Sequence, residues 1–262
     1  MTIKLNEEIT KSNKVITYLD GTVEEKIVNP SVPTTKKIDN NHFVNLYTGE
    51  VKEFRKPITK RDSLKSVSSK MIASRELIYN SACMYVPNVW FVTLTFKAPV
   101  TDYGVAESHF KRFIRKLKRK HPKMRYGVWR QIQLERKTWH FHLVVWSPED
   151  INLNSEKLKE HWINGTRHTS RIETTKDLNK ILFYLTNYDN WSSNKKVQKR
   201  IKTLEYMDPG LRLFSSSQGL EMPKFRYENE RKKDSRRILF ASRRTCEFNG
   251  ETIEACIIKD SA

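Results

Sequence analysis

Residues 128–146 constrain the fold of this chain more than any other stretch. Two runs rich in β-branched and aromatic residues flank a short polar turn at residues 135–138, a pattern typical of a β-hairpin. Side chains alternate between the two faces of a strand, so His140 and His142 are expected on one face and Phe141 on the other, in a core.

The alternation places two imidazoles two residues apart on one face, where they can share a metal ion. Gln131, on the preceding run, is expected on the same face and offers an amide oxygen as a further ligand. The pattern also fits two solvated histidines on a half-exposed strand. The hairpin alone leaves both interpretations open.

The charge balance indicates the kind of partner. Lys and Arg outnumber Asp and Glu by 49 to 30, which gives a net charge of +19. This excess argues for a polyanion, nucleic acid before a membrane surface. A membrane is not expected, since the sequence has neither a long apolar span nor a basic amphipathic helix with a wide apolar face. The first ten residues have no apolar signal region, so we expect the protein in the cytoplasm of its host cell.

Hydrophobic periodicity predicts the order of the elements. We expect a helix over 61–85, a strand over 88–96, a helix over 105–120, the hairpin, a helix over 154–163 with Ser155 as its cap, a strand over 166–172 and a helix over 174–190. This order predicts an α+β fold, an antiparallel sheet with helices packed on one face, related to the ferredoxin-like arrangement. No Gly-rich phosphate loop of the Walker type is present, so no motor is encoded in this sequence.

Composition divides the chain into three parts. Residues 1–60 form a polar N-terminal extension, residues 61–225 a catalytic-type domain and residues 226–262 a basic C-terminal segment. Short strands are possible in both extensions, near residues 14–19, 43–47, 236–242 and 253–259.

The helix over 174–190 carries two tyrosines. Its apolar stripe is formed by Leu178, Ile181, Leu182 and Leu185. Tyr184 and Tyr188 follow each other at a spacing of one helical turn, which predicts that both face the same direction. Lys180 lies one turn before Tyr184, where it either supports a phenolate or is a plain surface lysine.

Three elements therefore occur in a characteristic order: the apolar strand over 92–96, the His140-Phe141-His142 strand, and the tyrosines of the later helix. This order resembles the HUH endonuclease superfamily, specifically the rolling-circle replication initiator (Rep) proteins of phages, plasmids and integrated elements. The likeness covers roughly residues 61–225, with a weaker part at residues 208–214. It implies a ferredoxin- and RRM-like HUH nuclease core with basic N- and C-terminal extensions.

The resemblance implies roles for four residues. His140 and His142 would hold a divalent metal ion, Mn²⁺ or Mg²⁺, although imidazoles also accept Zn²⁺ or Co²⁺. Tyr184 would attack DNA, and Tyr188 matches the second tyrosine of two-tyrosine members. We favour Tyr184 for the first cut because Tyr188 lies close to the expected helix end and is followed by an aspartate.

The chain departs from the family at two positions. The third ligand of the family, often a glutamate eight or nine residues before the first histidine, meets Ile132 or Gln131 here. Only Gln131 has a ligating side chain on the expected face. The lysine usually found three residues after the nucleophile is Asn187.

The implied activity is site-specific nicking and joining of DNA by a metal-dependent endonuclease. Tyrosine attack at an origin leaves a 5′-phosphotyrosine and a free 3′-OH that primes rolling-circle replication. The implied substrate is a single-stranded or hairpin origin, and a host helicase and polymerase are expected because no motor motif is encoded.

Basic side chains are the expected DNA contacts. We assign this role to Lys111, Arg112, Arg115, Arg130, Lys195 and Lys196. The basic run over 111–120 is equally consistent with a solvated helix face. Trp129, Trp139 and Trp191 either stack on unpaired bases or, as we favour, pack within the fold.

Three other functions remain open from the sequence. The two-tyrosine spacing also occurs in transposases of the same superfamily. The Gln131 and Asn187 departures are compatible with a catalytically weak or inactive protein that binds an origin without nicking it. A basic sheet that carries aromatic residues also suits a nucleic-acid-binding module without catalysis.

Overall fold

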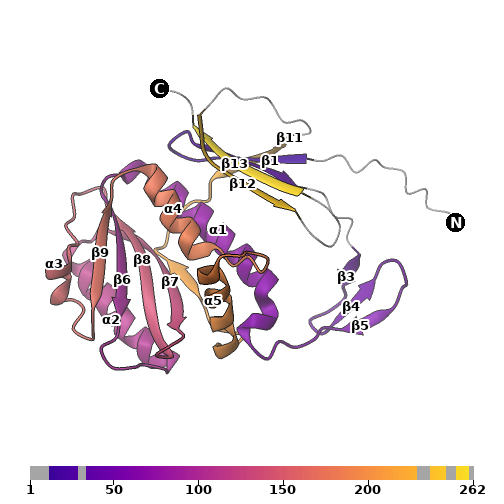
Figure 1. The fold of residues 1–262 in the computed structure, drawn as a ribbon, viewed down its shortest axis with the longest axis horizontal. Coiled ribbons are helices and arrows are strands. Elements are labelled where there is room, and N and C mark those ends of the chain that lie inside the picture. The colour runs from indigo at the N-terminus through magenta and orange to yellow at the C-terminus, as the bar shows by residue number, and fades with distance from the viewer. Residues whose placement is uncertain (1–11, 29–33, 229–236, 246–251, 260–262) are drawn as a thin grey trace. The chain divides into compact units, whose positions relative to one another are not determined.

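The computed structural model describes residues 12–28, 34–228, 237–245 and 252–259 (Figure 1). The chain divides into two compact units, one made of residues 1–56 and 223–262 and the other of residues 57–222. The second unit contains the predicted hairpin.

The first unit contains two antiparallel sheets. The larger has the strand order β11-β1-β2-β13-β12. Its strands are β1 (Ser12–Thr17), β2 (Val23–Val28), β11 (Lys224–Glu228), β12 (Arg237–Thr245) and β13 (Thr252–Lys259). The smaller has the order β3-β4-β5, with β3 (Thr35–Lys37), β4 (His42–Asn45) and β5 (Val51–Glu53). The segments that the sequence predicts as separate extensions thus contribute strands to one sheet.

The second unit is built on a five-stranded antiparallel sheet with the order β10-β7-β8-β6-β9. Its strands are β6 (Val89–Thr95), β7 (Arg125–Gln133), β8 (Thr138–Trp146), β9 (Arg167–Ile172) and β10 (Phe214–Ser216). The helices are α1 (Leu64–Ala82), α2 (Tyr103–Lys120), α3 (Ser155–Lys159), α4 (Thr175–Thr186) and α5 (Lys195–Thr203), with 3-10 turns at Lys60–Ser63, Cys83–Tyr85 and Leu204–Tyr206. The predicted α+β class, the antiparallel sheet and the hairpin are confirmed.

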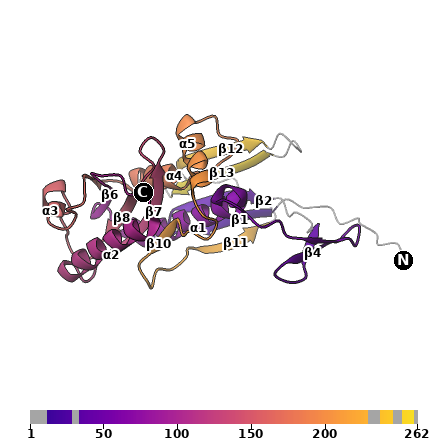
Figure 2. The same cartoon turned by 90° about the horizontal axis from the view of Figure 1, so that it is seen from below.

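Helix α2 covers one face of this sheet (Figure 2). The Asp102 side chain caps it by accepting a hydrogen bond from the Val105 amide at 2.7 Å. The Phe110 ring stacks on Phe141 of β8 with centroids 4.7 Å apart, and Trp162 joins this cluster. These aromatic rings form the core that the hairpin alternation predicts for the Phe141 face.

Helices α1 and α4 cover the opposite face and lie side by side (Figure 1). The Trp129 indole of β7 donates a hydrogen bond to Ser74 of α1 at 3.1 Å, and Arg75 of α1 lies over the Phe183 ring of α4 at 4.1 Å. The expectation that the helices pack on one face is therefore wrong. The histidine face carries enough apolar surface, including the fully buried Val144 and Trp146, to require a helical layer of its own.

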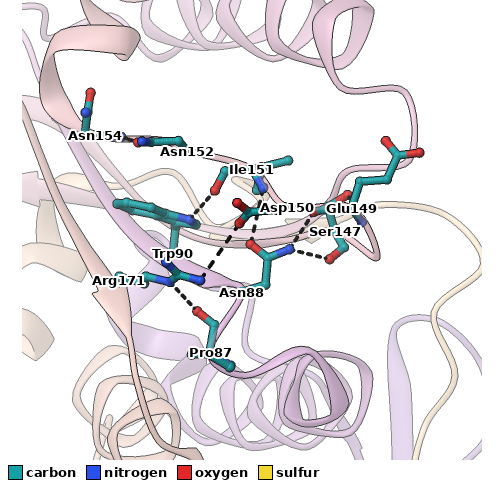
Figure 3. Close-up of polar contacts among 10 residues, drawn as sticks. All are labelled: Pro87, Asn88, Trp90, Ser147, Glu149, Asp150, Ile151, Asn152, Asn154 and Arg171. Carbon is teal, nitrogen blue, oxygen red and sulfur yellow. Dashed lines mark hydrogen bonds and ion pairs between the residues drawn. The ribbon is translucent and has the colours of Figure 1, made fainter.

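The loop after β8 is fixed to the ends of β6 and β9 by a polar network (Figure 3). The Asn88 amide group donates to the carbonyl oxygens of Ser147 and Glu149, and the Trp90 indole donates to the Ile151 carbonyl at 2.8 Å. The helix that follows is shorter than predicted. Its cap is Asn154, whose side chain accepts from the Lys157 amide at 2.9 Å, so Ser155 is the first helical residue and not the cap.

The tyrosine-bearing helix α4 also ends earlier than predicted. Its cap Thr174 accepts from the Asp177 amide, and the helix stops at Thr186, where Asn187 adopts an extended backbone with ψ of 108°. Tyr188 therefore lies beyond the helix. Among the described residues, no helix is both long and apolar enough to span a membrane.

Candidate active site on the histidine face

The sheet register brings the predicted metal ligands together. His140 of β8 lies directly across from Gln131 of β7, and His142 lies across from Thr93 of β6. Residues opposite each other in antiparallel strands share a face, so all four side chains lie on the side covered by α1 and α4. The His140 and His142 rings meet edge to face, with centroids 4.7 Å apart.

His142 is held in one orientation. Its Nδ1 shares a hydrogen bond with the Thr93 hydroxyl oxygen at 3.0 Å, and the Phe91 ring stacks on the imidazole at 5.8 Å. Engagement of Nδ1 leaves Nε2 as the ring nitrogen available to a ligand. Sequence reasoning did not find Thr93, although the alternation of β6 and its register against β8 together place a hydroxyl there.

Both histidines are neutral at physiological pH. Burial, followed by the positive charge of Arg200, lowers the pKa of His140 to about 4. Burial, then the neighbouring His140 and then Arg200 hold the pKa of His142 well below its usual value. Neutral imidazole is the form that binds metal, because the ligating nitrogen must carry a lone pair.

Gln131 completes the candidate ligand set. Its side chain is buried, and its Nε2 atom has no hydrogen-bond partner among the described residues. Turning the amide by 180° brings the carbonyl oxygen to the same place, where a cation supplies the missing interaction. In the described part of the chain no three His, Cys, Asp or Glu side chains form a metal cluster, which fits a set whose third member is an amide.

The donor set accordingly suits a divalent cation. Two imidazole nitrogens and one amide oxygen match the ligand chemistry of first-row divalent ions and leave coordination positions open. All three donors are neutral and Arg200 adds a positive charge nearby, so the site is weaker than one with a carboxylate.

Tyr184 lies beside the histidines. Its ring meets His142 edge to face with centroids 6.5 Å apart, and the side chain is 47% exposed. An accessible phenol next to the ligand pair satisfies the first requirement for a nucleophile, which is access to both the substrate and the group that orients it.

Tyr188 has a different environment. It is only 4% exposed, and burial raises the pKa of its phenol to about 12. The prediction that Tyr184 and Tyr188 share a helical face is wrong, because α4 ends before Tyr188 and the chain turns inward.

Arg200 of α5 is the site residue that the sequence analysis missed. It is 6% exposed, and its guanidinium carbon lies 4.8 Å from the Tyr184 ring centre and 5.8 Å from that of Tyr188. Its Nη1 donates to the Asn187 carbonyl oxygen at 3.0 Å. A signal was available, since Arg200 stands in the apolar stripe of α5 between Val197 and Ile201, where a charged residue is unexpected.

Lys180 is not brought into this cluster by any contact. Its ammonium group donates to Asp177 at 3.2 Å, one turn back along α4, and its side chain is largely exposed.

The expected DNA contacts fall into two groups. Lys111, Arg112, Arg115, Lys195 and Lys196 are exposed. Lys111 and Arg115 also line a groove of about 660 Å³ together with Arg212. Arg130 is buried and forms a bidentate ion pair with Glu107 at 2.7 and 2.9 Å, so its guanidinium is already engaged. Of the three tryptophans, Trp129 and Trp139 are buried and pack as favoured, whereas Trp191 is 74% exposed.

Comparison with known proteins bears on this site. Residues 89–193 match the family model of the replication-associated protein ORF2. The match covers less than half of the chain, runs from β6 to just beyond α4 and includes both histidines and both tyrosines. It supports a replication initiator. No curated protein matches the chain.

Two solved structures show a distant likeness. The hypothetical protein ORF119 of Sulfolobus islandicus rod-shaped virus 1 is 14% identical, with a TM-score of 0.32 over 50% of this chain and 99% of that chain. The N-terminal nuclease domain of the non-structural protein-1 of minute virus of mice, which has a unique Zn²⁺ coordination in its active-site pocket, is 8% identical, with a TM-score of 0.19 over 82% of this chain and 71% of that chain. Scores this low carry no argument for activity.

Proposed function

We propose that this protein initiates rolling-circle replication by nicking a single-stranded or hairpin DNA origin and later rejoining the strands. The observation that carries the proposal is the placement of the exposed Tyr184 beside His142, on the face where His140, His142 and Gln131 converge. The family match supports the replication context. Because no Walker-type loop is present in the sequence, unwinding and synthesis are assigned to a host helicase and polymerase.

Tyr184 is the proposed nucleophile. Its phenol oxygen attacks the phosphorus, an Oη–P bond forms, and the P–O3′ bond breaks. The phenol proton is lost to solvent and the leaving 3′ oxygen takes up a proton, which gives a 5′-phosphotyrosine and a free 3′-OH. Attack by a later 3′-OH on the phosphotyrosine reverses these steps and rejoins the strand.

His140, His142 and Gln131 would hold a divalent cation, for which Mn²⁺ or Mg²⁺ is proposed. When bound, such an ion polarises the scissile phosphate and neutralises the charge that develops in the transition state. Thr93 fixes the His142 ring, and burial keeps both imidazoles unprotonated and ready to bind. Tyr188 is proposed as a supporting residue, since its phenol is buried and resists ionisation.

Formation of a covalent adduct tests this function. The protein is incubated with a labelled pool of single-stranded oligonucleotides of randomised sequence, with Mn²⁺ or with EDTA, and denatured before electrophoresis. A labelled band at the mass of the protein plus DNA, dependent on Mn²⁺, is expected. DNA binding without any adduct would instead favour the inactive origin-binding protein that the neutral Gln131 also allows.

A further inference from the structure

Arg200 is a buried cation without a counter-ion. It is 6% exposed, yet it makes no ion pair with any carboxylate of the described residues. Buried charges in proteins are almost always paired, because removing a charge from water without compensation is costly. An anion that is absent from the protein itself therefore belongs beside this guanidinium.

The geometry of its hydrogen bonds shows which edge is open. Nη1 is occupied by the Asn187 carbonyl oxygen at 3.0 Å, which fixes the plane of the guanidinium. Nε is buried and, like Nη2, has no hydrogen-bond partner in the described part of the chain. Nε and Nη2 together form the side-on fork with which arginine binds two oxygens of one anion.

Arg130 shows the same fork in use. Its Nε and Nη2 donate to the two carboxylate oxygens of Glu107 at 2.7 and 2.9 Å. Arg130 and Arg200 are both buried, but only Arg130 has an acidic partner. The comparison within one molecule indicates that the open edge of Arg200 is the acceptor site for an external oxyanion.

The surroundings of Arg200 select the anion. The guanidinium lies against the Tyr184 ring at 4.8 Å and is close enough to His140 and His142 to influence both imidazoles. Every one of these neighbours is neutral or positive, so the cluster attracts negative charge before a metal ion is present.

We propose that Arg200 is the phosphate-binding residue of this site and that its Nε and Nη2 donate to the two non-bridging oxygens of a DNA phosphodiester beside Tyr184. The proposal rests on the proposed function for the identity of the anion. It implies that DNA binds at this site without metal and that the phosphate then supplies the negative charge that Gln131 does not.

Binding of single-stranded DNA in EDTA tests this role separately from chemistry. The probe is a fluorescein-labelled oligothymidylate, followed by anisotropy over a range of salt concentrations. Arg200→Gln is expected to weaken binding about tenfold and to lower the logarithmic salt slope by about 0.7, the value for one lost phosphate contact on a single strand. Arg200→Lys keeps the charge but has no fork, so it is expected to keep the slope and to lose about threefold in affinity.

Lys202→Gln is the matched control, because it removes the same charge from an exposed position of the same helix. Its affinity is expected to stay within about twofold of wild type, a change of less than about half a kcal/mol. Unchanged affinity in Arg200→Gln, or an equal loss in Lys202→Gln, would overturn the phosphate assignment. If Arg200→Gln fails to fold, the Arg200→Lys affinity decides, and a value equal to wild type overturns the proposal. Because no reaction occurs in EDTA, a wild-type protein that forms no adduct would contradict the proposed function and leave this result standing.

Discussion

Thr93 lies directly across the sheet from His142 and shares a 3.0 Å hydrogen bond with its Nδ1. A hydroxyl in this position fixes both the ring orientation and the tautomer of the histidine, so that Nε2 is presented to a ligand. A strand that carries no ligand of its own therefore contributes to the candidate metal site.

Replacing Thr93 by Val tests this contribution. The substitution keeps a β-branched side chain in β6 and removes only the hydroxyl, so Mn²⁺ affinity measured by calorimetry is expected to fall about tenfold or more. Thr95→Val is the control, because Thr95 lies on the same face of β6 and its hydroxyl pairs with Thr166. Equal affinities in the two variants would show that the Thr93 hydroxyl does not support the site.

The neutral third ligand leads to a prediction of the opposite sign. Gln131→Glu adds a negative charge across from His140, so Mn²⁺ is expected to bind at least about tenfold more tightly. His140→Ala combined with His142→Ala is expected to abolish binding while the circular dichroism spectrum stays native. Retention of Mn²⁺ binding in the double variant would place the metal elsewhere.

The low pKa of His140 predicts how stability depends on pH. Unfolded histidine titrates near 6.5 and the folded residue near 4, so between these values the unfolded state binds a proton that the folded state does not. Stability is therefore expected to fall as pH is lowered, by about 2 kcal/mol between pH 7 and pH 5. Urea unfolding of His140→Gln should show a correspondingly flatter pH dependence, and an unchanged dependence would refute the assignment.

Two glycines predict unequal costs of a single methyl group. A Cβ at Gly165 would overlap the Thr95 carbonyl oxygen, a backbone atom of β6 that cannot move without disturbing the sheet. A Cβ at Gly127 would meet the Ile78 Cδ1 atom at 2.5 Å, the mobile end of a side chain. Gly165→Ala is expected to cost roughly 3 kcal/mol or more and Gly127→Ala about 1 to 2 kcal/mol in urea unfolding. Ile78→Val should restore stability only to the Gly127 variant.

Much of the fold follows from local pattern. The strands of the hairpin, the helix that became α2 and the positions of His140, His142 and Gln131 on one face all follow from periodicities of two and 3.6 residues. These features depend on residues within one element or on its nearest neighbour, which is why the sequence is sufficient for them.

The features that the sequence did not predict depend on tertiary contacts. The end of α4 at Thr186 depends on how the following segment packs, because no proline or glycine marks the position. Arg200 reaches Tyr184 from a separate helix later in the chain, and no spacing rule connects the two. The second helical layer arises because apolar residues share the histidine face.

The identity of the tyrosine that carries DNA tests the account most directly. Covalent adducts formed with Mn²⁺ are digested and the modified peptide is sequenced by mass spectrometry, for the wild-type protein, Tyr184→Phe and Tyr188→Phe. The exposed Tyr184 beside His142 is expected to carry the nucleotide, with no adduct in Tyr184→Phe and an adduct retained in Tyr188→Phe. A nucleotide found on Tyr188 in the wild-type protein would contradict the account.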